Sequence, residues 1–208
     1  MALKKGQPTP PCHSPGERQE PRNLETLLQT LLDEDVMKRR WAARDLAEHP
    51  AAAEALVTRL RHEKDATVLQ VIVTSLGCIA NEVAICGLID CLYSEHTLLR
   101  NAAIEVLKEL PEPVAPHMGK LLHDPDPDVR IFAVNVLESL RHPQVEAWLL
   151  EVILKDEHIN VCATAVDLLG EVGSPRSRDA LRALKQRFPE EPYIQFAADL
   201  ALKRIGAG

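Results

Sequence analysis

The sequence predicts an all-α fold, a right-handed α-solenoid of about six helical hairpins. The first observation is a column of small or apolar residues that recurs every 30 to 32 positions. The second is an apolar column four positions later, so that one helix face is repeated six times. A period of this length indicates stacked units that bury their apolar faces only against their neighbours. The first column is Ala42, Ile72, Ala103, Ala133, Ala165 and Ala197, and the second is Leu46, Leu76, Leu107, Leu137, Leu169 and Ala201.

The chain is expected to divide into a leader and a repeat array. Residues 1–22 carry five of the fifteen prolines and almost no apolar periodicity, which predicts a disordered Pro-rich leader. Asn23 is suited to cap a helix that begins at Leu24. The array therefore occupies 23–206, and Gly206 closes its last helix.

Each unit is expected to contain a helix A, a polar turn, a helix B that carries both columns, and a short link. The turns supply acidic residues that can cap the following helix, and the links supply Pro or Gly, which end helices. The turns are 33–35, 62–65, 94–96, 123–128, 156–158 and 189–192, and the links are 49–50, 111–113, 142–143 and 173–175. The terminal units should have polar outer faces, as Glu25, Gln29, Lys203 and Arg204 indicate.

Composition argues against several classes of partner. The formal net charge of -7 disfavours a nucleic-acid backbone or an anionic membrane surface, and favours a partner with basic character. The aromatic content of 3% is too low for a surface that stacks bases. No apolar stretch reaches the roughly 18 residues of a spanning helix, and no secretory signal opens the chain. We therefore expect a cytoplasmic protein.

One segment resembles a known repeat. Asp126, Pro127, Asp128, Val129 and Arg130, followed by the column alanine and leucine, are similar to the HEAT-like repeat, above all to its bacterial form named after the phycobilisome lyases. The resemblance implies stacked hairpins in which helix B lines the concave side. It also implies a ladder between an Asp in the turn and an Arg early in helix B. The arginine position reads Arg39, Leu69, Arg100, Arg130, Cys162 and Ile194, so three of six units lack it.

The predicted function is a non-enzymatic scaffold or adaptor that binds another protein on the concave helix B face. The positions two before and two after the first column share one face and run from basic, through a small apolar step, to acidic. The predicted contact residues are Arg40, Arg44, Ile131, Asn135, Asp167 and Asp199. The alternative interpretation is that these are ordinary solvated positions.

A rival surface lies on helix A. Trp148 occupies a position at which two other units carry glutamate, and large aromatic residues at such positions are typical of interface anchors. The longer turn beside this unit could instead bury the indole ring.

The resemblance also leaves two further functions open, because the family includes accessory proteins of chromophore attachment and a di-iron hydroxylase. The hydroxylase relative uses His-Glu dipeptides, of which this chain has one, His62-Glu63. The remaining pairs are reversed and fall once per repeat, which predicts a line rather than a metal cluster. The cysteines show no CxxC spacing and are expected to be small core residues. No catalytic, cofactor or metal site is therefore predicted.

Overall fold

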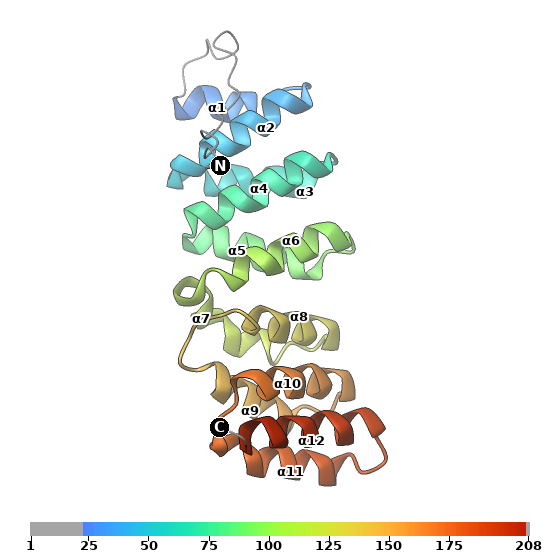
Figure 1. Cartoon of the computed structure of the whole chain (residues 1–208). Helices are drawn as coiled ribbons and strands as arrows, with labels where there is room; N and C mark the ends of the chain where they lie inside the picture. Colours follow the sequence, from blue (N-terminus) through green and yellow to red (C-terminus); the bar gives the residue numbers. More distant parts are fainter. Residues whose placement is uncertain (1–22, 207–208) are drawn as a thin grey trace, which may run out of the picture.

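The computed structural model describes residues 23–206, where twelve α-helices form six stacked hairpins and no strand occurs (Figure 1). The α-solenoid prediction is confirmed. The A helices are α1 (Leu24–Thr30), α3 (Ala53–His62), α5 (Glu82–Asp90), α7 (Pro111–Leu121), α9 (Val145–Lys155) and α11 (Arg178–Arg187). The B helices are α2 (Val36–Asp45), α4 (Ala66–Ile79), α6 (Thr97–Lys108), α8 (Pro127–Leu137), α10 (Ile159–Val172) and α12 (Pro192–Gly206). Short 3-10 turns cover Leu46–Glu48, Pro50–Ala52, Cys91–Tyr93 and Pro175–Ser177.

The helix boundaries follow from capping residues in the predicted turns. The Asn23 side chain accepts a hydrogen bond of 2.8 Å from the Thr26 N–H, which fixes the start of α1. Asp35, Asp65 and Asp126 cap α2, α4 and α8 in the same way. The predicted leader, 1–22, lies outside the described residues.

The two columns form the centre of the solenoid. Every member of both columns is at most 5% exposed, so the predicted register of helix B is confirmed in all six units. Each B helix packs on the next one, from α2 through to α12, and α3, α5 and α7 do the same in the A layer. A chain of this kind has one continuous core rather than separate domains.

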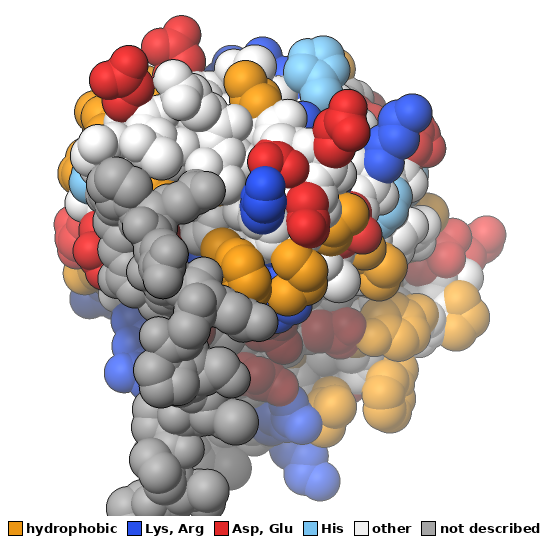
Figure 2. All heavy atoms as spheres, turned by 90° about the horizontal axis from the view of Figure 1, so that it is seen from above, with side chains coloured by type: hydrophobic (Ala, Val, Ile, Leu, Met, Phe, Trp, Pro, Cys, Tyr) orange, Lys and Arg blue, Asp and Glu red, His pale blue; other side chains and the backbone are white. Residues whose placement is uncertain are grey.

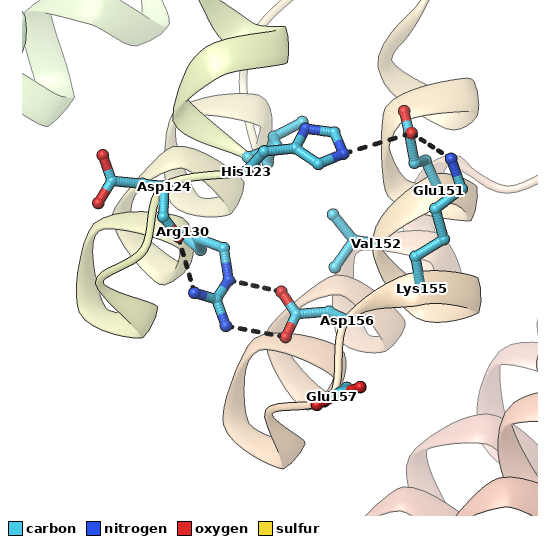
Figure 3. Close-up of a pocket in the computed structure, with 9 residues that line it drawn as sticks. His123, Asp124, Arg130, Glu151, Val152, Lys155, Asp156 and Glu157 are labelled. Atoms are coloured by element: carbon cyan, nitrogen blue, oxygen red, sulfur yellow. Dashed lines mark hydrogen bonds and ion pairs between the residues drawn. The ribbon is translucent and has the colours of Figure 1, made fainter.

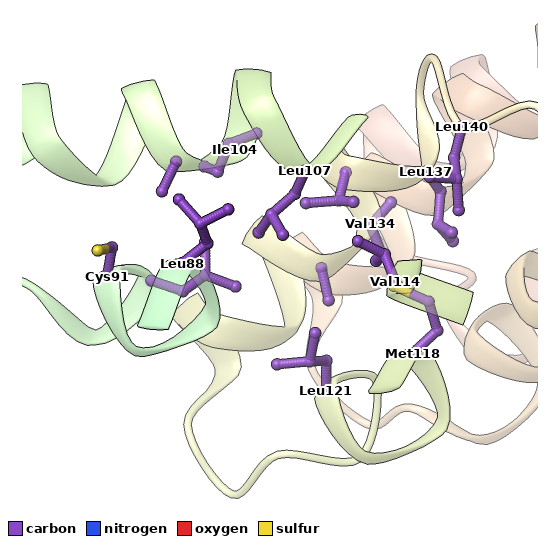
Figure 4. Close-up of a cluster of buried hydrophobic side chains, with 14 of the residues drawn as sticks. Leu88, Cys91, Ile104, Leu107, Val114, Met118, Leu121, Val134, Leu137 and Leu140 are labelled. Atoms are coloured by element: carbon purple, nitrogen blue, oxygen red, sulfur yellow. The ribbon is translucent and has the colours of Figure 1, made fainter. Parts of the chain in front are cut away.

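The junction between units three and four illustrates this core (Figure 4). Leu88 of α5, Leu107 of α6, Val114 and Met118 of α7 and Leu137 of α8 are at most 1% exposed and meet there. Burial of a side chain of this size contributes about 1.5–3 kcal/mol.

The exposure of the cysteines tests the prediction that they are core residues. Cys91 and Cys162 are buried, but Cys78 and Cys86 are exposed, so the prediction that these two cysteines are core residues is wrong. Cys86 lies on the outward side of α5, and Val83, which is 46% exposed, lies on the same side.

None of the helices within 23–206 has the length and apolar character needed to cross a bilayer.

Candidate partner-binding surface

The outward side of the six B helices forms a continuous surface, which we call the helix B face. It consists of the positions two before and two after the first buried column. Eight of the twelve side chains are exposed, and Ile131, Asn135, Ala163 and Gln195 are half-buried. The full set is Arg40, Gln70, Asn101, Ile131, Ala163, Gln195, Arg44, Thr74, Glu105, Asn135, Asp167 and Asp199.

At its N-terminal end the helix B face contains an apolar groove of about 680 Å³ between α2, α4 and α6. Arg40 stands at one side of it, and Val71 and Leu98 line it. Leu98 is 69% exposed, at a position of helix B that is exposed in every unit. The groove thus combines apolar side chains with polar ones that include the basic Arg40 and the acidic Glu105.

In the middle of the face, one lysine links two units. Lys108 of α6 donates to Glu105 Oε1 at 2.9 Å and to Glu138 Oε2 at 2.6 Å in the next unit. Its own side chain is 11% exposed, whereas the two carboxylates are largely exposed. The surface presented to solvent here is therefore acidic.

Further along, the face becomes more acidic. Asn135 and Asp167 line one shallow pocket of about 230 Å³ between α8 and α10, together with Glu138 and Glu171. Two of the predicted contact residues are thus brought together, in surroundings dominated by carboxylates.

At the C-terminal end an apolar stripe of α12 lies beside these carboxylates. Tyr193, Phe196 and Leu200 are 54%, 66% and 38% exposed. The Tyr193 hydroxyl donates to Asp167 Oδ2 at 2.6 Å, and this hydrogen bond raises the pKa of the Tyr193 phenol. We call this surface the aromatic–acidic patch. It consists of Tyr193, Phe196, Leu200, Asp167 and Asp199.

At both ends of the predicted charge gradient, a charged side chain of the helix B face is paired with a neighbouring side chain of opposite charge. Arg44 lies 3.2 Å from the Asp45 carboxylate, and Asp199 is paired with Lys185 of α11. The predicted apolar step at Ile131 and Ala163 is half-buried. The strongest apolar exposure on this side lies instead at Leu98 and Phe196, which stand on neighbouring columns.

Trp148 belongs to the other layer, on α9. It is half-buried, packs against the core, and stacks on His142 with ring centroids 5.1 Å apart and planes inclined by 12°. Part of the indole ring is thus covered by the preceding link.

Two arginines of the predicted ladder bind an acidic residue of the next unit with the same geometry. Arg39 Nε and Nη2 donate to Glu63 at 2.8 and 3.0 Å, and Arg130 Nε and Nη2 donate to Asp156 at 2.7 and 3.0 Å (Figure 3). Burial alone would raise the pKa of Glu63, but hydrogen bonds from Arg39, Arg59 and two backbone N–H groups lower it to about 2.

The third arginine does not join the ladder. Arg100 donates to the Ser94 carbonyl and lies over the Phe132 ring, 4.6 Å from its centroid. The acidic residue of the next turn, Asp124, accepts instead from the Tyr93 hydroxyl at 2.5 Å, which raises the pKa of Tyr93 to about 12. Only two of the three expected pairs therefore form.

An arginine that the sequence pattern did not indicate reaches one of the units without a ladder arginine. Arg187, at the end of α11, donates to the Leu154 and Asp156 carbonyls at 2.7 and 2.6 Å and to Cys162 Sγ at 3.1 Å. The sequence feature that could have indicated this contact is a basic residue in the last turn of α11, which stacking places beside the turn at 156–158 of the preceding unit.

A small pocket of about 270 Å³ lies along these turns, and its charged side chains other than Glu157 are paired within the protein (Figure 3). Glu151 contacts both Lys155 at 2.7 Å and His123 at 3.4 Å. The bond from Lys155 lowers the pKa of Glu151. We interpret this edge as a structural seam between units four and five.

The cysteine environments do not favour a nucleophile. Desolvation raises the pKa of Cys91 to about 12, and desolvation with the nearby Glu82 carboxylate raises that of Cys86. A reactive thiol requires the opposite shift.

The end of the solenoid at α1 and α2 shows a mixed surface (Figure 2). On the part of this end that the described residues form, hydrophobic, acidic and basic side chains are interspersed. The predicted terminal polar residues Glu25, Gln29, Lys203 and Arg204 are all exposed.

Stacked two-helix units that share one continuous core place the chain in the class of helical-repeat proteins. The chain belongs to the HEAT-repeat family, since the HEAT repeat model matches residues 24–108 and 115–203. No curated protein matches the sequence.

The chain is similar to several solved structures, of which one agrees with this fold at a TM-score above 0.5. TOG3 of Drosophila melanogaster Mini spindles is 18% identical over 86% of this chain and 93% of that chain, with a TM-score of 0.56. The CpcE and CpcF complex of phycocyanin lyase from Nostoc is 18% identical over 97% and 100%, with a TM-score of 0.41. Human deoxyhypusine hydroxylase is 16% identical over 88% and 84%, with a TM-score of 0.48. At this identity the likeness to TOG3 concerns the fold alone, and no conclusion is drawn from the other two, whose TM-scores are below 0.5.

Proposed function

We propose that the protein is a non-enzymatic scaffold whose helix B face binds a protein segment with basic and apolar side chains. The observation that carries this proposal is the aromatic–acidic patch. Phe196 and Tyr193 are large, exposed and rigid, and aromatic residues of this kind are enriched among interface anchors. Tyr193, Phe196 and Leu200 form one exposed apolar stripe along α12, and contiguous exposed apolar surface is typical of interaction sites.

The charge around the patch specifies the partner's chemistry. Glu138, Asp167 and Glu171 line one pocket, and Asp199 lies on the next B helix. Lys108 and Lys185 are the counter-charges of Glu138 and Asp199. Complementary charge accelerates association and selects among partners. A lysine- or arginine-bearing amphipathic segment suits this arrangement, with its apolar side against Phe196.

The structural role of Glu63 supports the non-enzymatic part of the proposal. The carboxylate of the one His-Glu dipeptide is 1% exposed and is held by Arg39 and Arg59, so it is committed to the ladder. A chromophore-attachment role is tested separately by titrating the protein with a bilin and recording absorbance, which we expect to remain the sum of the two components.

The experiment for the scaffold function compares proteins retained from a lysate of the source cells by matched variants of the full chain. Asp167→Lys with Asp199→Lys and, separately, Phe196→Ala should each lose the partner. The control carries the same charge change on exposed A-layer positions, Glu54→Lys with Asp179→Lys, and should keep it. Equal loss in the control variant, with circular dichroism unchanged, would contradict a role for the helix B face.

A further inference from the structure

A cluster of three potential metal ligands lies on the A layer, away from the helix B face. Glu82 and Cys86 stand four residues apart on α5, so they share one side of that helix. His117 of α7 lies beside them, one repeat further along the chain. The carboxylate oxygen, the thiol sulfur and one imidazole nitrogen are all within 4.8 Å of one another.

The distances between these atoms suit a tetrahedral metal ion. Glu82 Oε1 lies 3.6 Å from Cys86 Sγ and 3.5 Å from His117 Nε2. Zinc binds sulfur at about 2.3 Å and nitrogen or oxygen at about 2.0–2.2 Å, so ligand atoms on two corners of its tetrahedron are about 3.3–3.6 Å apart. Two of the three edges thus already have the required length, and the third, between Cys86 Sγ and the His117 ring nitrogen, is at most 4.8 Å.

His117 provides an independent observation. Its Nε2 atom is closed to solvent and has no hydrogen-bond partner among the described residues, although the ring as a whole is 20% exposed. Glu82 Oε1 is near enough for an ion pair but does not complete a hydrogen bond to this atom. A buried polar atom without a partner is uncommon, and a bound ion is one of the explanations for it.

We propose that Glu82, Cys86 and His117 form a binding site for Zn²⁺ with one position open to water. Thiolate and imidazole ligands select zinc and its neighbours over magnesium and calcium, which prefer oxygen alone. On binding, the Cys86 S–H bond breaks, the proton passes to solvent and the sulfur bonds the metal, without a change of oxidation state. The Glu82 side chain is 77% exposed, which leaves the open position accessible.

The test uses Co²⁺ as a spectroscopic substitute for zinc in the full chain. Wild type should develop a near-ultraviolet sulfur-to-cobalt charge-transfer band together with visible bands of a four-coordinate ion, and Zn²⁺ should displace both. Cys86→Ser should abolish the charge-transfer band. His117→Ala should weaken the affinity for zinc at least about tenfold, since even outer-shell partners of a metal are worth 10–100-fold.

Two cysteine variants make the result specific to this site. Cys78→Ser removes another exposed thiol and should leave the titration unchanged. Cys12→Ser removes a thiol outside the described residues and should likewise leave it unchanged. Absence of a charge-transfer band in wild type, or a band that survives Cys86→Ser and disappears with Cys12→Ser, would overturn the proposal. Circular dichroism of each variant verifies that the fold is retained.

Discussion

Arg39 of α2 and Glu63 of the following unit form a two-bonded ion pair that is almost closed to solvent, with side chains 9% and 1% exposed. The pair joins the first two units, and Arg39 also donates to the Asp33 and Glu34 carbonyls of its own turn. Because every hydrogen-bonding group of the pair is used, the pair fixes the register of one hairpin on the next.

The first prediction concerns the loss of one partner. Arg39→Ala leaves the Glu63 charge buried with fewer partners, and breaking a buried pair costs about 3–5 kcal/mol. Urea unfolding should show this loss. The matched control is Arg61→Ala, whose pair with Asp90 is 63% and 60% exposed and should contribute at most about 1 kcal/mol. Similar losses for the two variants would contradict the structural importance of the ladder.

The second prediction concerns pH. The pKa of Glu63 is lowered from 4.5 to about 2 in the folded protein, so the unfolded chain binds this proton more readily. The resulting stabilisation is present above pH 4.5 and is lost as the pH falls from there towards 2. It amounts to about 3 kcal/mol at neutral pH. The unfolding free energies of wild type and Glu63→Gln should therefore converge across this window, and a constant difference would show that protonation of Glu63 is not involved.

The third prediction concerns a close approach between units. A Cβ atom at Gly87 would lie 2.3 Å from Val57 Cγ2 and 3.3 Å from Val57 Cβ, so rotation of the valine does not relieve the contact. Gly87→Ala should lower the free energy of unfolding by about 1–3 kcal/mol through overpacking. Gly119→Ala, where nothing lies within 4 Å, should instead raise it by up to about 1 kcal/mol through helix propensity. Thermal unfolding of both variants checks the opposite signs.

The fourth prediction tests the helix B register. Leu137→Ala removes a side chain that is 1% exposed and should cost about 2–5 kcal/mol. Asn135→Ala, two positions earlier on the outward side, should cost less than about 0.5 kcal/mol. Comparable costs in chemical unfolding would mean that the two faces of α8 are assigned wrongly.

Much of the fold could be predicted because the repeat makes each unit a copy of the same packing problem. The spacing of Ala103, Leu107 and their equivalents fixed both the helix and its buried side. The fate of Arg100 could not be predicted in this way, since it depends on Phe132 of the next unit. The apolar pattern of one helix does not show that Phe132 contacts Arg100 or that Tyr93 donates to Asp124 in place of Arg100.

The surface was harder to predict for the same reason. Phe196 stands on a column that is half-buried in the other five units, so its exposure depends on what the adjacent helix offers, whereas the column of Leu98 is exposed in every unit. Cys86 has no histidine near it in sequence, but stacking places His117 beside it, one period later. The repeat length itself is the signal that could have found this pair.

The most direct measurement of the central claim is site-specific photocrosslinking of the full chain in its source cells. A photoreactive residue at Asn101 or Asn160, both exposed on B helices, should form an adduct with the partner. The same residue at Glu54 or Ala147, exposed on A helices, should not. The Asn160 adduct should disappear when Asp167→Lys and Asp199→Lys are added. Adducts from the A-layer positions alone, unaffected by the charge reversal, would show that the binding surface is the side that carries Trp148.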